Sequence, residues 1–229
     1  MIVEVKVIDR LFKTGLCLLT TCTVLYVYAF NVNNHSNGLK GDQNNIVWLD
    51  LAVENLNVLQ SKEYNYFARN LKKIQGVESL LISIEKDSNG IVPKEYILGT
   101  IFAESRAKPD ALNKRTKALG LTQVTPVGLK GLQQSISRYK WICNSRNDKK
   151  LKAALKCSSD YIARVKEGYP LIIKLTANTG INYYNLTNPK VSIRVAAAIS
   201  IINAIELSRG KSIQTYYDPQ MVYRGLIAY

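Results

Sequence analysis

The chain has 229 residues, of which 47% are hydrophobic and 21% charged, an ordinary composition for a globular protein. The length suits one medium domain with an appendage or two small domains, and the composition excludes collagen-like and wholly disordered classes. A single histidine, His35, excludes His-rich metal sites and any Ser-His-Asp relay that does not use it. Because Cys-x-x-Cys pairs and glycine-rich phosphate loops are also missing, we expect neither a metal nor a cofactor.

The charge balance indicates an anionic partner. Lys and Arg number 31 against 17 Asp and Glu, a formal net charge of +14. Nucleic acid, an acidic membrane or an acidic polymer such as a bacterial cell wall would suit this charge. The excess is concentrated between Lys130 and Lys156, where eight basic residues accompany one acidic residue, Asp148. A solvated helical surface explains this run equally well, and no nucleic-acid-binding motif accompanies it.

The N-terminal region contains an uncharged stretch from Thr14 to Phe30, preceded by Lys6, Arg10 and Lys13. Its seventeen residues would span about 25 Å as a helix, the short end of a membrane span. Basic residues before such a stretch place the N-terminus in the cytoplasm and direct the rest outward. We therefore expect residues 1–30 to be a membrane anchor, inserted through residues 11–30, or a signal peptide cleaved after residue 29. A buried core helix is the remaining alternative.

The rest of the chain is predicted to be mainly α-helical. Residues 31–45 are rich in Asn and Gly and indicate a linker, so we divide the chain into 1–30, a linker and helical segment at 31–90, and a main domain at 91–229. Apolar residues at helical spacing predict helices in 46–56, 67–74 and 77–84, with a break at 87–90. Further helices are predicted to begin at Pro93, Thr125-Pro126, Asn188-Pro189 and Asp218-Pro219. A short strand or hairpin is considered near 113–123.

Two cysteines, Cys143 and Cys157, lie fourteen residues apart in a polar, basic stretch. If the chain is exported, an oxidising compartment would let them form a disulfide worth about 3 kcal/mol. Two free, buried thiols are the equally weighted alternative.

One carboxylate has an unusual position in its predicted helix. Glu104 follows Ile97 by seven residues and Ile101 by three, so it is expected to share their apolar face and to point into the interior. It also lies in the last turn of the helix starting near Pro93. Desolvation and the negative end of the helix dipole would both raise its pKa, as a general acid near neutrality requires.

Spacing alone also permits a structural role for Glu104. A buried glutamate is usually paired with a cation, and Arg106, Lys108 and Arg115 are nearby candidates.

The stretch AESRAKPDALNKRTKALGLTQVTP resembles the signature of the lytic transglycosylases of the lysozyme-like superfamily. In that signature a helix ends in Glu-Ser, a loop carries Pro and an Ala-x-Asn turn, and Gly-Leu-Met-Gln precedes a Pro-initiated helix. Two further stretches, LTNPKVSIRVAAAISII and YRGLIAY, are similar to later motifs of the family. The resemblance covers about 91–229, apart from an unmatched basic insertion near 138–180. The matching residues of the first stretch are Glu104, Ser105, Pro109, Ala111, Asn113, Ala118, Gly120, Leu121, Gln123 and Pro126.

The resemblance implies a lysozyme-like helical domain that cleaves peptidoglycan between N-acetylmuramic acid and N-acetylglucosamine. In the family one glutamate, here Glu104, acts first as acid and then as base, and the product carries a 1,6-anhydro ring. Most glycosidases need two carboxylates, whereas ring closure uses a nucleophile that the substrate itself carries. A single placed carboxylate therefore fits a transglycosylase better than a lysozyme-type hydrolase, which remains an alternative.

The resemblance also assigns supporting roles. Ser105 would bond substrate or orient Glu104, Gly120 would allow backbone to approach the sugar with a positive φ, and Gln123 would contact an N-acetyl group. The other expected substrate-binding residues are Leu121 and Tyr229, the latter beside Glu104. The expected partners are peptidoglycan and the membrane, together with an envelope-spanning secretion, conjugation or phage-entry assembly. The expected location is the cell envelope, with the protein facing the periplasm or exported.

Three departures from the family pattern leave alternatives open. Thr122 stands where Met is usual, Arg106 stands where Gly is usual, and Tyr229 ends the sequence before the expected Asn and Gly, so we expect a C-terminal truncation. The second hypothesis is a non-catalytic wall-binding or envelope-assembly protein on the same fold. The third, a basic helical nucleic-acid binder, conflicts with an exported N-terminus, so no nucleic-acid partner is expected.

Overall fold

The computed structural model describes residues 61–145, 147–208 and 210–213. Within these ranges the chain forms seven α-helices and one short 3₁₀ helix, and no β-strand, which confirms the mainly α prediction. No helix in the described ranges has both the length and the apolar character needed to cross a bilayer. Several predicted features lie outside the described residues: the anchor at 11–30, the helices at 46–56 and after Asp218, and Tyr229.

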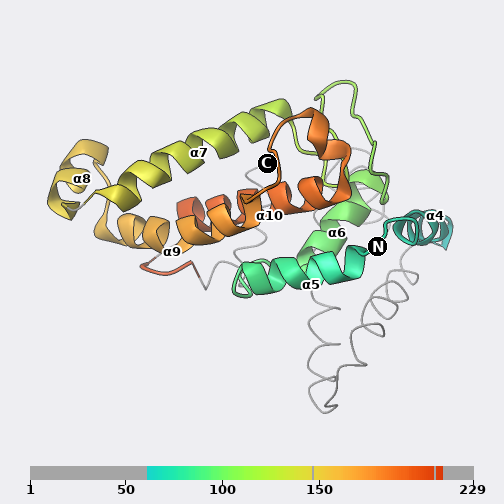
Figure 1. Cartoon of the computed structure of the whole chain (residues 1–229), viewed down its shortest axis with the longest axis horizontal. Coiled ribbons are helices and arrows are strands. Elements are labelled where there is room, and N and C mark those ends of the chain that lie inside the picture. The colour runs from blue at the N-terminus through green and yellow to red at the C-terminus, as the bar shows by residue number, and fades with distance from the viewer. Residues whose placement is uncertain (1–60, 146, 209, 214–229) are drawn as a thin grey trace, which may run out of the picture.

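Three long helices form the centre of the molecule (Figure 1). They are α7 (Pro126–Asn144), α9 (Ser159–Thr176) and α10 (Pro189–Leu207), and α10 packs against both of the others. The sequence predicts one inner stripe on α10, but the helix is buried on more than one face. The reason is that α5 (Val77–Asp87) covers a further side of it, which requires an apolar or small residue at most positions.

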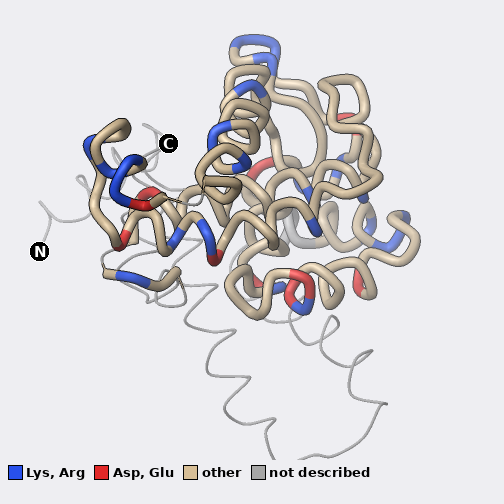
Figure 2. Tube along the Cα trace, turned by 60° about the vertical axis from the view of Figure 1, so that its left-hand side comes forward, with Lys and Arg blue, Asp and Glu red and all other residues tan. Residues whose placement is uncertain are grey.

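The remaining helices surround this centre. α6 (Lys94–Ser105) packs on α5, whereas α4 (Ser61–Leu71) and α8 (Asp148–Leu155) lie at opposite ends of the molecule (Figure 1). The Phe67 and Phe102 rings meet edge to face, with centroids 5.0 Å apart, and this contact joins α4 to α6. α4 and α5 therefore share one hydrophobic core with the helices after residue 90. Basic positions are spread over several helices rather than confined to one (Figure 2).

Helix boundaries follow the predicted capping signals. The Thr125 side chain accepts a hydrogen bond from the Gly128 N–H at 3.0 Å, and Asn188 accepts one from the Lys190 N–H at 2.9 Å. Both caps precede a proline in the first turn, where its missing N–H leaves no helical bond unmade. The predicted starts of α7 and α10 are therefore confirmed.

α6 ends in a left-handed turn at Arg106, whose φ is +53°. The backbone N–H groups of Arg106 and Ala107 both donate to the Ile101 carbonyl, which satisfies a carbonyl that the helix end would leave unpaired. A positive φ is the conformation that glycine adopts most easily. Arg106 therefore occupies a position where glycine would meet less conformational strain.

The loop from 106 to 125 is compact without forming strands. Leu119 and Val124 exchange two backbone hydrogen bonds of 3.1 and 3.2 Å, and Leu112 forms a second isolated antiparallel bridge with Leu119. The hairpin considered near 113–123 is therefore present only as two isolated bridges.

Gly120 fixes this loop against the 3₁₀ helix η1 (Tyr184–Thr187). Its φ is +86°, and a Cβ atom built there would lie 2.1 Å from the Leu186 carbonyl oxygen. The residue must therefore lack a side chain for two independent reasons, conformational and steric.

Gly120→Ala should destabilise the protein by about 2 kcal/mol more than Gly90→Ala. Gly90 also has a positive φ, +76°, but a Cβ there would meet no atom within 4 Å, so this control isolates the conformational cost. Urea denaturation of both variants measures the difference. Equal losses would mean that the loop moves away from η1 without cost.

Candidate functional site

Glu104 lies in the last turn of α6, and its side chain is exposed. The prediction that it points into the interior is wrong, although Ile97 and Ile101 on the same face are completely buried. Helical spacing identifies a face but not where the core beneath that face ends. In this last turn Phe102 and Ser105 are buried whereas Glu104 is exposed, so the core covers one side of the turn and Glu104 lies on the uncovered side.

The environment of Glu104 favours its protonated form. Protein atoms around the carboxyl group displace water although the side chain remains accessible, and this desolvation raises its pKa. The guanidinium of Arg106 has the smaller, opposite effect and lowers the pKa. An accessible carboxyl group with a raised pKa is suited to donating a proton to a ligand.

Two of the three cations that could neutralise Glu104, Arg106 and Lys108, are engaged elsewhere. The Arg106 guanidinium donates hydrogen bonds to the carbonyls of Phe102 and Ala103 and lies over the Phe102 ring, 4.8 Å from its centroid. The Lys108 ammonium lies 5.2 Å from the centroid of the Tyr66 ring. Among the residues that the structure describes, no ion pair to the Glu104 carboxylate is formed. The paired-glutamate alternative is therefore not the arrangement in this part of the chain.

α4 supports the end of α6 through contacts that the sequence did not predict. The Asn70 side chain donates to the Arg106 carbonyl at 3.1 Å. A hydrogen bond with Lys108 lowers the pKa of Tyr66 and raises that of Lys108. These contacts join residues 36 to 42 positions apart, so no local pattern could have identified them.

Two of the expected substrate-binding side chains are inaccessible. Ser105 is 6% exposed, and its hydroxyl donates to the Ile101 carbonyl one turn earlier, at 3.2 Å, instead of reaching Glu104 or solvent. Leu121 is completely buried in the hydrophobic core. Their side chains therefore shape the end of α6 and the loop from within, which corrects the expectation of direct ligand contact.

Gln123 acts as an internal brace of the loop. Its Nε2 donates to the Ala111 carbonyl at 2.8 Å and to the Gly120 carbonyl at 3.0 Å. The predicted contact of this amide with an N-acetyl group therefore competes with bonds already made. Gly120 has the expected positive φ, but its close approach is to Leu186.

Thr122 and Ser192 form a buried pair of hydroxyl groups between the loop and α10. The Thr122 hydroxyl donates to the Ser192 carbonyl at 3.1 Å, and the two hydroxyl oxygens are 3.0 Å apart. The Thr122 N–H donates to the Ser192 Oγ at 3.2 Å. A hydroxyl at position 122, where the resembling family has Met, is therefore matched by a polar partner on the facing helix.

Cys143 and Cys157 are free thiols in the structure, as the alternative to a disulfide expected, but both are only partly buried. The Cys143 thiol is directed toward the Val165 carbonyl on α9, 4.0 Å away, and desolvation raises its pKa. The described ranges also contain no group of three or more His, Cys, Asp or Glu side chains placed to hold a metal ion.

A second polar cluster joins the three central helices. The hydroxyls of Tyr139 on α7 and Tyr161 on α9 donate to the same oxygen of Glu206 on α10, at 2.7 and 3.0 Å. Desolvation, followed by the effect of the Glu206 carboxylate, raises the pKa of Tyr161 to about 12 and raises that of Tyr139 as well. Both tyrosines therefore stay protonated and serve as donors that hold the helices together.

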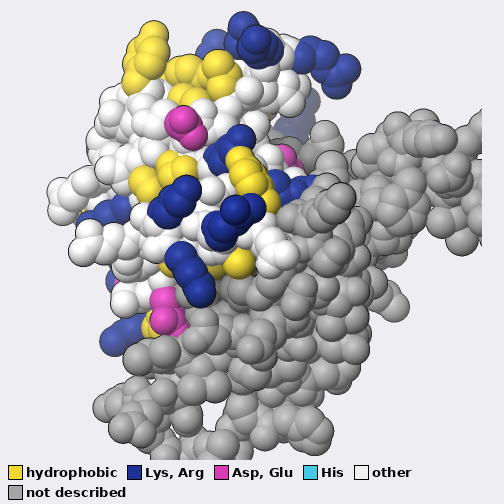
Figure 3. Space-filling view, turned by 90° about the vertical axis from the view of Figure 1, so that its right-hand side faces the viewer, with side chains coloured by type: hydrophobic (Ala, Val, Ile, Leu, Met, Phe, Trp, Pro, Cys, Tyr) yellow, Lys and Arg dark blue, Asp and Glu magenta, His cyan; other side chains and the backbone are white. Residues whose placement is uncertain are grey.

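The surface around the loop after α6 is basic with apolar patches. Figure 3, which faces this end of the molecule, shows Lys and Arg side chains beside exposed hydrophobic ones and few acidic side chains. From the loop, exposed side chains include Leu112, which is 52% exposed, and the basic residues Lys108, Lys114, Arg115 and Lys117. Such a surface suits an anionic polymer that also has apolar faces.

Comparison of the chain with protein-family models, curated proteins and solved structures finds no match.

Thr122→Val should cost about 1–2 kcal/mol, because it removes the partner of a buried hydroxyl. Ser192→Ala should cost a similar amount, and the double variant should lose less than the sum, by about 1 kcal/mol. Urea denaturation of the four proteins gives this coupling energy. Strictly additive losses would show that the two hydroxyls do not stabilise each other.

Glu104→Gln should stabilise the protein at neutral pH but not at acidic pH. Because the pKa of Glu104 is raised in the folded protein, protonation of this group stabilises the fold. This stabilisation is complete below the pKa of a glutamate in the unfolded chain, about 4.3, and is lost as the pH rises through the pKa of Glu104 in the folded protein. Glutamine keeps a neutral side chain at every pH. Because the group is exposed, the gain should be roughly 0.5 kcal/mol or less.

Urea denaturation midpoints measured at pH 7.5 and pH 4 test this expectation. Asp110→Asn is the control variant, because it removes another exposed negative charge from the same surface. A gain for Glu104→Gln that is equal at the two pH values would contradict a raised pKa.

Proposed function

We propose that the chain is a peptidoglycan lytic transglycosylase with a lysozyme-like helical domain, in which Glu104 is the acid and base. The observation that carries the proposal is an accessible carboxylate at the end of α6 with a raised pKa and no ion pair among the described residues. The resemblance of residues 104–126 to the family signature supports the same role. The basic surface near the site is consistent with an anionic wall polymer as substrate.

In the proposed reaction, protonated Glu104 transfers its proton to the oxygen that links N-acetylmuramic acid to N-acetylglucosamine, and the bond from that oxygen to the muramic C1 breaks. The resulting carboxylate accepts the proton of the muramic 6-hydroxyl, and the 6-oxygen forms a bond to C1. One carboxyl group suffices because the nucleophile belongs to the same sugar. Activity should decline as the pH rises through the pKa of Glu104, because the first step needs the protonated form.

A non-catalytic wall-binding or envelope-assembly protein is the second candidate function. It is favoured by one observation: the Ser105 and Leu121 side chains are buried and the Gln123 amide group is bonded within the loop. Both candidates place the protein at the cell envelope, tethered by residues 11–30 or exported.

Digestion of purified peptidoglycan by the wild type should release anhydro-muropeptides, and Glu104→Gln should reduce their release by at least about 100-fold. Mass spectrometry identifies these products, because each is lighter by one water than the corresponding hydrolysis product. Asp110→Asn, which removes the acid nearest to Glu104 along the loop, should leave release nearly unchanged.

Products with ordinary reducing ends would indicate a lysozyme-type hydrolase. No release by the wild type, with wall binding retained, would favour the non-catalytic candidate.

A further inference from the structure

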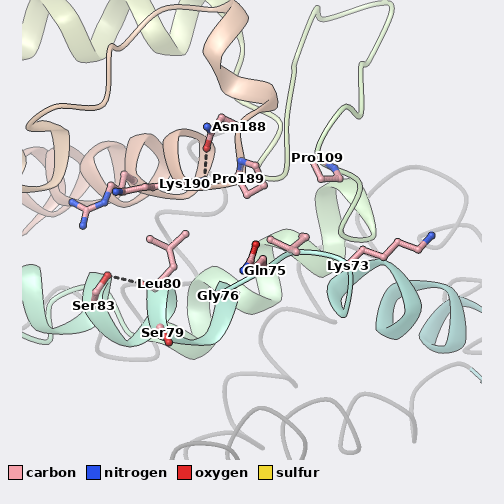
Figure 4. Close-up of a pocket in the computed structure, with 12 residues that line it drawn as sticks. Lys73, Gln75, Gly76, Ser79, Leu80, Ser83, Pro109, Asn188, Pro189 and Lys190 are labelled. Carbon is pink, nitrogen blue, oxygen red and sulfur yellow. Dashed lines mark hydrogen bonds between the residues drawn. The ribbon is translucent and has the colours of Figure 1, made fainter.

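A groove of about 550 Å³ lies between α5 and the first turn of α10 (Figure 4). The segment between α4 and α5 forms one end of it. Pro109 contributes to its wall and belongs to the loop that directly follows α6, so this loop connects the groove to the helix that carries Glu104.

The lining combines cationic ends with an apolar centre. Lys73 and Lys190 lie toward opposite ends of the groove, with the Leu80 side chain between them (Figure 4). Ile74 and Pro189 add further apolar surface, and no Asp or Glu is among the described residues that line it. An elongated ligand with small apolar groups between separated anionic groups would match this arrangement.

The two lysines supply the charge that a ligand would meet. Arg194 also lines the groove, but it already pairs with Asp87 at 3.2 Å and donates to the Leu175 carbonyl at 3.3 Å. Lys73 and Lys190 are exposed, and neither forms an ion pair within the described ranges. The positive end of the α10 helix dipole adds to the potential near Lys190.

We propose that this groove binds the short acidic peptide branches of peptidoglycan while the glycan strand lies at Glu104. The inference rests on the proposed substrate. The peptide branches carry separated carboxylates together with the apolar methyl groups of their alanines, and these are the kinds of group that the two lysines and the apolar residues of the groove would contact. Each exposed lysine–carboxylate contact is weak alone, so recognition depends on a ligand that reaches both lysines.

Binding is tested by isothermal titration at low salt, with the full-length Glu104→Gln protein in detergent and the synthetic peptide N-acetyl-L-Ala-γ-D-Glu-L-Lys-D-Ala. Acetylation removes the positive N-terminus, which in the wall is also in an amide bond, so the peptide keeps a net negative charge. The Lys73→Gln/Lys190→Gln variant should bind at least about fivefold more weakly. A peptide with both carboxyl groups amidated should lose binding to the same degree. Lys149→Gln/Lys152→Gln, which removes the same charge from α8 at the opposite end of the molecule, should bind as tightly as the parent.

Any of three results would overturn the proposal. The amidated peptide would bind as tightly as the unmodified one, the Lys73→Gln/Lys190→Gln variant would bind as tightly as the parent, or the α8 variant would lose as much affinity as the groove variant. Inorganic phosphate that competes at the same concentration as the peptide would also overturn it, because the groove would then be a general anion site.

The test separates this inference from the proposed function. The peptide has no glycosidic bond and the protein carries Glu104→Gln, so the binding result does not depend on catalysis. If the wild type releases anhydro-muropeptides but the Lys73→Gln/Lys190→Gln variant binds the peptide normally, the groove proposal is rejected and the proposed catalysis is not. If peptide binding depends on the two lysines but the wild type releases no anhydro-muropeptides, the proposed catalysis is rejected and the groove proposal is not.

Discussion

The attachment of the 106–125 loop to η1 and α10 is the constraint on which the candidate site depends. Gly120 allows the loop backbone to approach the Leu186 carbonyl more closely than any side chain would permit, and Thr122 pairs with Ser192 two residues later. These contacts are short, buried and more than sixty residues apart in sequence. They hold the loop that follows α6 against η1 and the first turn of α10.

The same region shows how a carboxylate stays unpaired in a chain with a net charge of +14. The nearest arginine, Arg106, is directed to the carbonyls that end α6, where helix geometry leaves acceptors unfilled. Lys108 is held by Tyr66 on α4. The cations around Glu104 are thus engaged by nearby groups of the fold, and desolvation becomes the larger influence on the Glu104 pKa.

Local signals in the sequence predicted much of the fold. The caps at Thr125 and Asn188, and the apolar spacing of 77–84, give the helix starts and faces because each depends on residues within one or two turns. The orientation of Glu104 could not be predicted in this way, since its exposure depends on which side of the last turn of α6 the rest of the chain covers. The Thr122–Ser192 pair and the Gln123 brace were also hidden, because each requires knowledge of which distant backbone faces the side chain.

The two described departures from the family motif have partners within this chain. Thr122 replaces an apolar residue, yet its hydroxyl is satisfied by Ser192. Arg106 occupies a left-handed position that favours glycine, at a cost of about 1–2 kcal/mol, and offsets part of that cost by donating to the Phe102 and Ala103 carbonyls. An uncompensated substitution would leave a buried hydroxyl or a strained turn without such contacts. These two departures therefore do not by themselves argue against the role proposed for Glu104.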